Sequence, residues 1–248
     1  FCLKQRHIYF FCDMDILQEL VCPITLQLPI DAVIAPDGRI YEKEAIWKWR
    51  KISKRSPITR KKMHGPIITS CQINNVIENI CDSVVSELTV EWKRRKALTV
   101  KIETLKKRAY ANDVNAIYSL AVLYTKGSLL ATNKKKARRL LQTGSLLGSA
   151  KCMAMFSEFV RLGIETNRNT SLSWIYLNRA AEKGSDVARF YLAICYVKGI
   201  KVDPDMKSAM KWFRGALTAP DKHLAHSKRE AIRQFLKEHC SFTQRLND

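Results

Sequence analysis

Apolar residues and glycines recur at a fixed interval in the C-terminal half of the chain. A step of 36 residues joins three copies of each position, as in Leu120, Phe156 and Leu192, or in Gly127, Gly163 and Gly199. An interval between 20 and 50 residues that keeps such positions in phase is typical of a solenoid of stacked repeats. A single copy cannot bury its apolar face alone, so the pattern predicts three units that share a continuous core.

Each copy divides into two helices, which the third copy shows best. Ala188, Leu192 and Cys195 fall on one helix face, and Gly199 follows where a left-handed C-cap is expected. A loop then precedes a second apolar helix over residues 209–216. The amphipathic segment from Leu224 to Cys240 is out of phase with the repeats, and we expect it to be a capping helix.

The N-terminal part contains shorter patterns, which predict strands and helices in turn. Apolar pairs at 33–34 and 40–41 bracket the sequence Ala-Pro-Asp-Gly, which predicts a hairpin with a turn. From Glu42 to Ile52, Ala45, Trp49 and Ile52 predict a helix with one apolar side. A second apolar helix face runs from Ile73 to Leu88.

A polar, basic segment without glycine or proline follows over residues 91–111, and we expect a further helix that spaces two domains. The predicted organisation is a first domain over residues 14–86, a linker helix over 87–111 and three repeats with a capping helix over 112–248. Residues 1–13 precede the first methionine, Met14, and are interpreted as a tag, an upstream fragment or disordered.

The formal net charge is +20, and most of the excess lies in residues 87–248. Such a charge favours acidic partners or nucleic acid without sequence preference. No run of about 18 apolar residues predicts a membrane span. The apolar stretch from Ile8 to Cys12 is too short and lacks a small-residue cleavage site, so no signal peptide is expected.

The chain has eight cysteines, and none of them forms a Cys-x-x-Cys pair or combines with histidine at zinc-finger spacing. We therefore expect reduced, mostly buried thiols in a cytoplasmic protein, no structural metal and no cofactor.

The repeats resemble Sel-1-like repeats, relatives of the tetratricopeptide class. The motifs that carry the resemblance are "AIYSLAVLYTKG", "ARFYLAICYVKG", "SLSWIYLNRAAEKG" and "SAMKWFRGAL", over about residues 113–220. The resemblance implies protein–protein recognition, here of a protein substrate by residues 112–220.

Residues 20–80 resemble a U-box, the zinc-free relative of the RING finger that ubiquitin ligases use. The matching pieces are "LVCPITLQLPIDAVIAPDGRIYEKEAI", "SPITRKKM" and "PIITSCQINNVIENI". The predicted fold class is thus a small α+β U-box followed by an all-α helical-repeat solenoid. The resemblance also implies that polar networks replace the metal, with the following candidates: Asp37, Lys43, Glu44, Ser56 and Thr59.

In this resemblance two proline-bearing loops, Pro23–Leu26 and Ser56–Arg60, form one surface that binds a ubiquitin-conjugating enzyme charged with ubiquitin. By position, the apolar contacts are Ile24, Leu26, Pro57 and Ile58, with Trp49 as their floor. Arg60 matches the basic residue that orients the conjugated ubiquitin, so the expected activity is that of a ligase without its own nucleophile.

Other interpretations remain open at this stage. The apolar loop residues could belong to a small core, and Arg60 could be a solvated loop charge. The chain could be a scaffold with a vestigial U-box, or a basic adaptor that binds acidic membranes or nucleic acid through Lys134–Lys136, although it carries no nucleic-acid motif. The location, if the protein is a microbial effector, would be the host cytosol.

Overall fold

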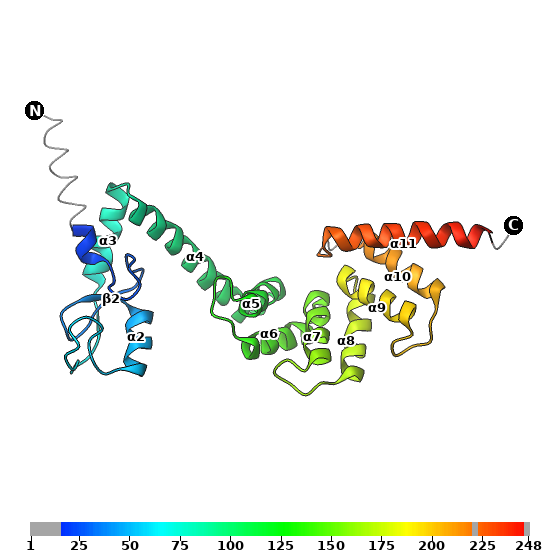
Figure 1. Cartoon of the computed structure of the whole chain (residues 1–248), viewed down its shortest axis with the longest axis horizontal. Coiled ribbons are helices and arrows are strands. Elements are labelled where there is room, and N and C mark those ends of the chain that lie inside the picture. The colour runs from blue at the N-terminus through cyan, green and yellow to red at the C-terminus, as the bar shows by residue number, and fades with distance from the viewer. Residues whose placement is uncertain (1–15, 220–222, 246–248) are drawn as a thin grey trace, which may run out of the picture. The chain divides into compact units, whose positions relative to one another are not determined.

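The computed structural model describes residues 16–219 and 223–245, and it divides into two compact units, Phe1–Ile102 and Glu103–Asp248 (Figure 1). Residues 1–13, interpreted above as a tag or fragment, lie outside the described part. Among the described residues, no helix is both long enough and apolar enough to cross a membrane.

The first unit is built around a three-stranded antiparallel sheet with the strand order β2-β1-β3. The strands are β1 (Ala32–Ile34), β2 (Ile40–Glu42) and β3 (Ile68–Thr69). Val33 pairs with Tyr41 on one side and with Thr69 on the other. The predicted hairpin is therefore confirmed, and Gly38 supplies the positive φ of 77° that its turn requires.

Helix α2 (Lys43–Ile52) follows β2 directly, as the sequence predicts, but its buried side is shifted. Ile46 is the buried residue, Ala45 and Trp49 are partly buried, and Ile52 is 84% exposed. The expected apolar side of Ala45, Trp49 and Ile52 therefore only partly faces the core, and its C-terminal end faces solvent.

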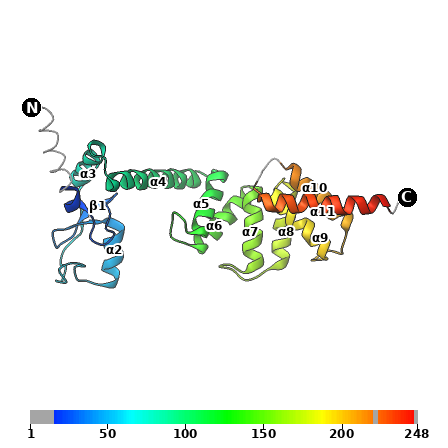
Figure 2. The same ribbon diagram turned by 45° about the horizontal axis from the view of Figure 1, so that its top comes forward.

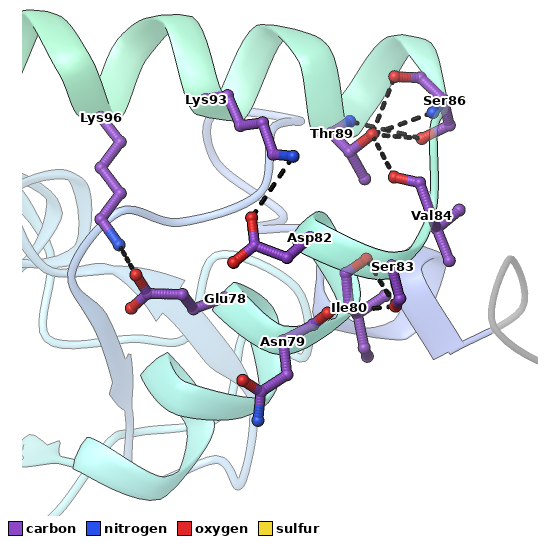
Figure 3. A network of polar contacts seen from close by, with 10 residues as sticks. All are labelled: Glu78, Asn79, Ile80, Asp82, Ser83, Val84, Ser86, Thr89, Lys93 and Lys96. Carbon is purple, nitrogen blue, oxygen red and sulfur yellow. Dashed lines mark hydrogen bonds and ion pairs between the residues drawn. The ribbon is translucent and has the colours of Figure 1, made fainter.

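The helix expected from Ile73 to Leu88 is interrupted. Helix α3 (Cys71–Ser83) ends before Val84, and α4 (Glu87–Tyr110) begins three residues later. Ser86 and Thr89 explain the break, because each side-chain oxygen accepts a hydrogen bond from the other's backbone N–H, at 3.3 and 2.9 Å (Figure 3). This reciprocal capping starts a new helix where the apolar pattern alone predicts continuity.

The first turns of α4 pack on α3 and on the sheet domain. Lys93 and Lys96 pair with Asp82 and Glu78 of α3, at 3.3 and 2.5 Å (Figure 3). Trp92 is 4% exposed within the apolar cluster that includes Leu17 and Ile77, and its indole N–H donates to the carbonyl of Pro29 at 2.9 Å. The start of the predicted linker helix is therefore part of the core of the first unit.

The second unit contains six helices of 13 residues whose starts repeat at the predicted 36-residue step, followed by α11 (His226–Arg245). They are α5 (Val114–Lys126), α6 (Lys134–Leu146), α7 (Ala150–Leu162), α8 (Thr170–Glu182), α9 (Asp186–Lys198) and α10 (Met206–Thr218). Figure 2 shows them stacked side by side, each against the next. The predicted pairs of helices are confirmed, and α11 covers most of the segment from Leu224 to Cys240 that the sequence predicts as a capping helix.

The repeat geometry follows from its helix ends. Asp113, Ser149 and Ser185 cap the first helix of each copy through their side-chain oxygens. Gly199 ends α9 with a φ of 65°, and a β-carbon there would approach the Pro204 ring to 2.9 Å. Glycine at this step is therefore required both by the backbone and by the following loop.

We predict that Trp92→Ala lowers the unfolding free energy of a fragment spanning residues 14–111 by about 3 kcal/mol, because it leaves a cavity and an unpaired Pro29 carbonyl. Urea denaturation measures the change. Trp47, which is 51% exposed on α2, is the control, and Trp47→Ala should stay within about 0.5 kcal/mol of the wild type. Equal effects of the two substitutions would contradict the packing of α4 on this domain.

Candidate functional site

The two proline-bearing loops of the first unit share one backbone geometry. Both carry the sequence Pro-Ile-Thr, preceded by Cys22 in one loop and by Ser56 in the other. The N–H of Leu26 donates to the Cys22 carbonyl at 2.8 Å, and the N–H of Arg60 donates to the Ser56 carbonyl at 3.1 Å. Leu26 and Arg60 then take left-handed φ angles of 55° and 58°.

A second pair of backbone bonds closes each loop. The N–H of Cys22 donates to the Gln27 carbonyl, and the N–H of Ser56 donates to the Lys61 carbonyl, both at 2.9 Å. Non-glycine residues rarely adopt left-handed φ, and such strain persists where the surroundings impose it. The loops are thus held in one conformation, with the side chains of Leu26 and Arg60 exposed at equivalent points.

The Asp37 carboxylate connects the hairpin to the second loop. One of its oxygens, Oδ2, accepts from the Tyr41 hydroxyl at 2.8 Å and from the Ser56 hydroxyl at 2.6 Å. The Ser56 oxygen in turn accepts from the N–H groups of Ile58 and Thr59, at 3.2 and 3.0 Å. Burial, reinforced by the hydrogen bond to Asp37, raises the pKa of Tyr41 to about 12.

Glu42 has the corresponding role beside the first loop. Its carboxylate accepts from the N–H groups of Ile30 and Asp31, at 2.9 and 3.3 Å, and lies 3.3 Å from the Arg95 guanidinium. Arg95 also donates to the carbonyl of Leu28 at 2.9 Å. A carboxylate at the end of β2 and a cation from α4 therefore fix the segment that follows the first loop.

Trp49 lies between the two loops. With Ile24, it packs against the core cluster that contains Cys22 and Ile46. Its indole N–H donates to the carbonyl of Arg55, directly before the second loop, at 2.8 Å. One tryptophan on α2 therefore packs on the same buried cluster as the apolar residue of the first loop and restrains the entry to the second loop.

Beside Trp49 runs a shallow groove of about 360 Å³. Its apolar lining is Ile24, Ala45, Trp49 and Ile52, and its polar edge is formed by Thr25, Glu42, Glu44 and Lys48. The structure thus brings Ile24 and Trp49 together. The other predicted site residues lie outside this lining: Leu26 and Ile58 are 73% and 45% exposed, Pro57 is partly buried and Arg60 is exposed.

The candidate polar residues have unequal roles. Asp37 and Ser56 form the network, while Thr59 contributes a backbone N–H. Lys43 pairs with Asp31 at 3.0 Å, and Glu44 is exposed, 3.7 Å from Lys48 of its own helix. Glu44 is therefore not a loop support.

Sequence reasoning missed Tyr41, Glu42 and Arg95 as polar supports, and Ile52 as an exposed apolar edge. The recurrence of Pro-Ile-Thr could have indicated two equivalent loops. Tyr41 stands four residues after Asp37, across the hairpin turn, which is a spacing that places their side chains in reach. Among the described residues, no group of three or more His, Cys, Asp or Glu side chains could hold a metal ion.

We predict that Tyr41→Phe lowers the stability of the first unit by about 1–2 kcal/mol below pH 10, because Asp37 loses a donor. The raised folded-state pKa stabilises the wild type fully below the unfolded value of about 10, and this contribution is lost as the pH rises towards 12. Urea denaturation should therefore show that the difference in unfolding free energy between the wild type and Tyr41→Phe becomes smaller as the pH rises from 8 to 12. Tyr110→Phe is the control, since Tyr110 is 87% exposed, and a gap that is constant with pH would contradict the network.

Comparisons with known proteins agree with this geometry. A family model of the U-box domain matches residues 16–79, and a model of the Sel1 repeat matches residues 114–149, 153–185 and 186–218. Over 86 residues the chain is 30% identical to "Probable bifunctional E2/E3 enzyme R795" of Acanthamoeba polyphaga mimivirus, covering 35% of this chain and 6% of that protein.

Over 52 residues the chain is 46% identical to "WD repeat, SAM and U-box domain-containing protein 1" of Homo sapiens, covering 21% of this chain and 11% of the human protein. The chain therefore spans only a small fraction of the length of these curated relatives. A crystal structure of a Sel1 repeat protein from Oxalobacter formigenes aligns with 54% of this chain and 98% of its own, with 27% identity and a TM-score of 0.45.

Both resemblances seen in the sequence motifs are confirmed by the family models, as is the fold class of a small α+β domain followed by helical repeats. The roles of the individual site residues remain predictions. Residues 16–79 of this chain are a U-box domain, and residues 114–218 are three Sel1 repeats.

Proposed function

We propose that this chain is a ubiquitin-protein ligase of the non-covalent U-box type, in which the first unit recruits a charged ubiquitin-conjugating enzyme and the repeats bind the substrate. The family of the first unit and the name of the viral relative, a probable bifunctional E2/E3 enzyme, support this activity. The observation that carries the proposal is the fixed pair of equivalent loops on either side of Trp49.

The apolar part of the proposed docking surface is already exposed. Leu26 and Ile58 stand out from the two loops, and the groove between Ile24 and Trp49 continues to Ile52. Rigid loops lose little conformational entropy when a partner binds, so modest apolar contacts are sufficient for a transient complex. A conjugating enzyme that places an apolar side chain in the groove would contact Ile24 of the first loop and Trp49, and it would need a further contact with Ile58 to engage the second loop.

In this proposal Arg60 acts on the conjugated ubiquitin. Its backbone is fixed twice, because its N–H donates to Ser56 and its carbonyl accepts from the Arg55 guanidinium at 3.2 Å. The side chain is exposed and starts from a defined point. A guanidinium held there can hydrogen-bond to ubiquitin and to the conjugating enzyme together, which restricts the thioester to poses that a lysine can attack.

Two of the three described thiols of the first unit are poorly suited to carry ubiquitin, whereas Cys71 is exposed. Cys22 is fully buried, and burial raises the pKa of the Cys81 thiol to about 11. Thiolate is the nucleophilic form of cysteine, so Cys81 holds almost none of it at neutral pH. In this proposal ubiquitin passes directly from the conjugating enzyme to the substrate lysine.

We predict that Arg60→Ala slows discharge of ubiquitin from the conjugating enzyme at least tenfold, with little change in the affinity for the uncharged enzyme, because the side chain acts on the conjugate. Single-turnover discharge to free lysine measures this step across a panel of conjugating enzymes. Lys61→Ala, at the adjacent exposed position, is the matched control. If the Arg60→Ala variant discharges ubiquitin at the wild-type rate from every conjugating enzyme that is active with the wild type, the role assigned to Arg60 is wrong.

We predict that Ile24→Ala and Ile52→Ala each weaken binding of the conjugating enzyme, by about 1–3 kcal/mol for the anchor Ile24 and by less for Ile52. Ile52 is the sharper probe, because an 84% exposed side chain can be removed without unfolding the domain. Isothermal titration calorimetry gives the affinities, and Ile68→Ala, at a 56% exposed position of β3, is the control. Unchanged affinity in both groove variants would reject this docking surface, and inactivity of the wild type with all conjugating enzymes would favour a scaffold.

A further inference from the structure

The second unit contains a larger groove than the first, with a volume of about 690 Å³. Helices α7, α8 and α9 form most of it, and α5 contributes Tyr118. The volume falls within the range of about 300–1,000 Å³ that is usual for ligand sites in proteins. This groove belongs to the repeats and is separate from the loops that the proposed transfer reaction uses.

The surface that lines the groove is mainly apolar. Met155 comes from α7, Trp174 and Leu177 from α8, and Tyr191 and Ile194 from α9. Trp174 and Leu177 also pack against the core cluster that contains Leu192, so their positions are fixed by the repeat stack. Tyr191 is 38% exposed. An exposed apolar surface held in this way is typical of an interaction site.

The acidic groups in the lining are already neutralised. Glu158 forms two hydrogen bonds with the Arg161 guanidinium, at 2.8 and 2.5 Å. Asp186 is 1% exposed, and its carboxylate accepts from Arg229 at 2.9 Å and from the N–H of Leu224 at 2.8 Å. Neither carboxylate therefore has a charge left to attract a cationic ligand.

Two cations of the lining, unlike these acids, have no partner of opposite charge among the residues whose side chains the structure describes. Arg168 lies in the loop after α7, and Lys201 lies in the loop after α9. Within residues 16–219 and 223–239, neither side chain has an acidic partner, and the Lys201 ammonium reaches only the Ser171 hydroxyl at 3.5 Å. The groove thus combines an apolar floor with positive charge from the equivalent interhelical loops of two successive repeats.

We propose that this groove binds an unstructured substrate segment in which apolar side chains are interleaved with glutamate or aspartate. The apolar side chains would contact Trp174, Tyr191 and Ile194, and the carboxylates would pair with Arg168 and Lys201. Two exposed cations without acidic partners can each pair with a carboxylate, and acidic side chains within a segment supply two of them where a lone terminal carboxylate does not. That the bound segment belongs to a substrate rests on the proposed function. The peptide binding itself does not depend on ligase activity.

The groove is less suited to the other anionic ligands that the net charge of +20 could attract. Nucleic acid needs cations along the phosphate backbone, and single-strand binders add stacked aromatic side chains. Here the densest basic run, Lys134–Lys136, begins α6 and is not part of the lining. Beside the aromatic rings of Trp174 and Tyr191, Met155, Leu177 and Ile194 offer aliphatic contacts, which fit leucine or phenylalanine side chains.

The test is selection of a random peptide library displayed on phage against the full chain, followed by fluorescence anisotropy with the enriched peptides synthesised in amidated form. We expect enriched peptides that contain both acidic and large apolar residues, and we expect alanine at either kind of position to weaken binding. The double variant Arg168→Glu with Lys201→Glu should raise the Kd at least tenfold, and binding should weaken with added salt.

The matched control is Lys135→Glu with Arg139→Glu, which makes the same change of charge at exposed positions of α6 outside the groove and should leave the Kd within about twofold. The binding assay contains no conjugating enzyme, so its result does not depend on ligase activity. A failure of the peptide-binding proposal can therefore be told apart from a failure of the proposed function. The proposal is overturned if no peptide is enriched, if the enriched peptides lack acidic residues, if binding requires a free C-terminal carboxylate, or if both double variants behave alike.

Discussion

The hydrogen bonds of the Asp37 carboxylate are the interaction on which the first unit depends most directly. One oxygen accepts hydrogen bonds from the hydroxyl groups of Tyr41 and Ser56. These bonds join the hairpin to the second loop, in which Ser56 stands 19 residues after Asp37. Ser56 then holds the backbone of its own loop through two N–H groups. A partly buried polar network of this kind specifies one arrangement only if all its members are paired, and here the carboxylate, both hydroxyls and the loop amides are paired. Glu42 does the same for the backbone after the first loop, with Arg95 as its cation. Two carboxylates thereby fix two loops whose own sequences are short and irregular.

The second unit is held together differently. Small residues such as Ala137 and Ala209 are fully buried where paired helices approach each other, and side-chain caps begin each helix at the same step. Stability in such a stack comes from each repeat packing on its neighbours, which leaves one face of the helices free. The groove around Trp174 and Tyr191 is such a face, and the ion pair of Asp186 with Arg229 ties α9 to the capping helix beside it. The division of labour in the proposed ligase follows from this contrast: fixed loops orient a common partner, and a repeat surface selects a variable one.

Much of the fold could be predicted from the sequence, because its signals are local or periodic. The step of 36 residues indicates the helices of the repeats, and the Ala-Pro-Asp-Gly turn between apolar pairs indicates the hairpin. The break between α3 and α4 could not be seen in the apolar pattern, since it arises from the reciprocal capping of Ser86 and Thr89. The role of α4 in the first core was missed for a related reason. Trp92 and Arg95 sit in a basic segment that resembles a solvated helix, and only tertiary contacts with Pro29 and Glu42 give them their function. In the candidate site, Ile24 and Trp49 were paired by the resemblance, whereas the carboxylate supports depend on contacts between residues distant in sequence.

The proposed ligase activity requires that the two equivalent loops and Trp49 act as one docking surface for a conjugating enzyme. The most direct measurement is an NMR titration of the isotope-labelled chain with an active conjugating enzyme, following backbone amides and the indole N–H of Trp49. We expect the amide signals of Ile24, Leu26, Ile58 and Arg60 to shift together with the indole signal and with one common affinity. Shifts confined to one loop, or to residues away from both loops with the Trp49 signal unchanged, would contradict it.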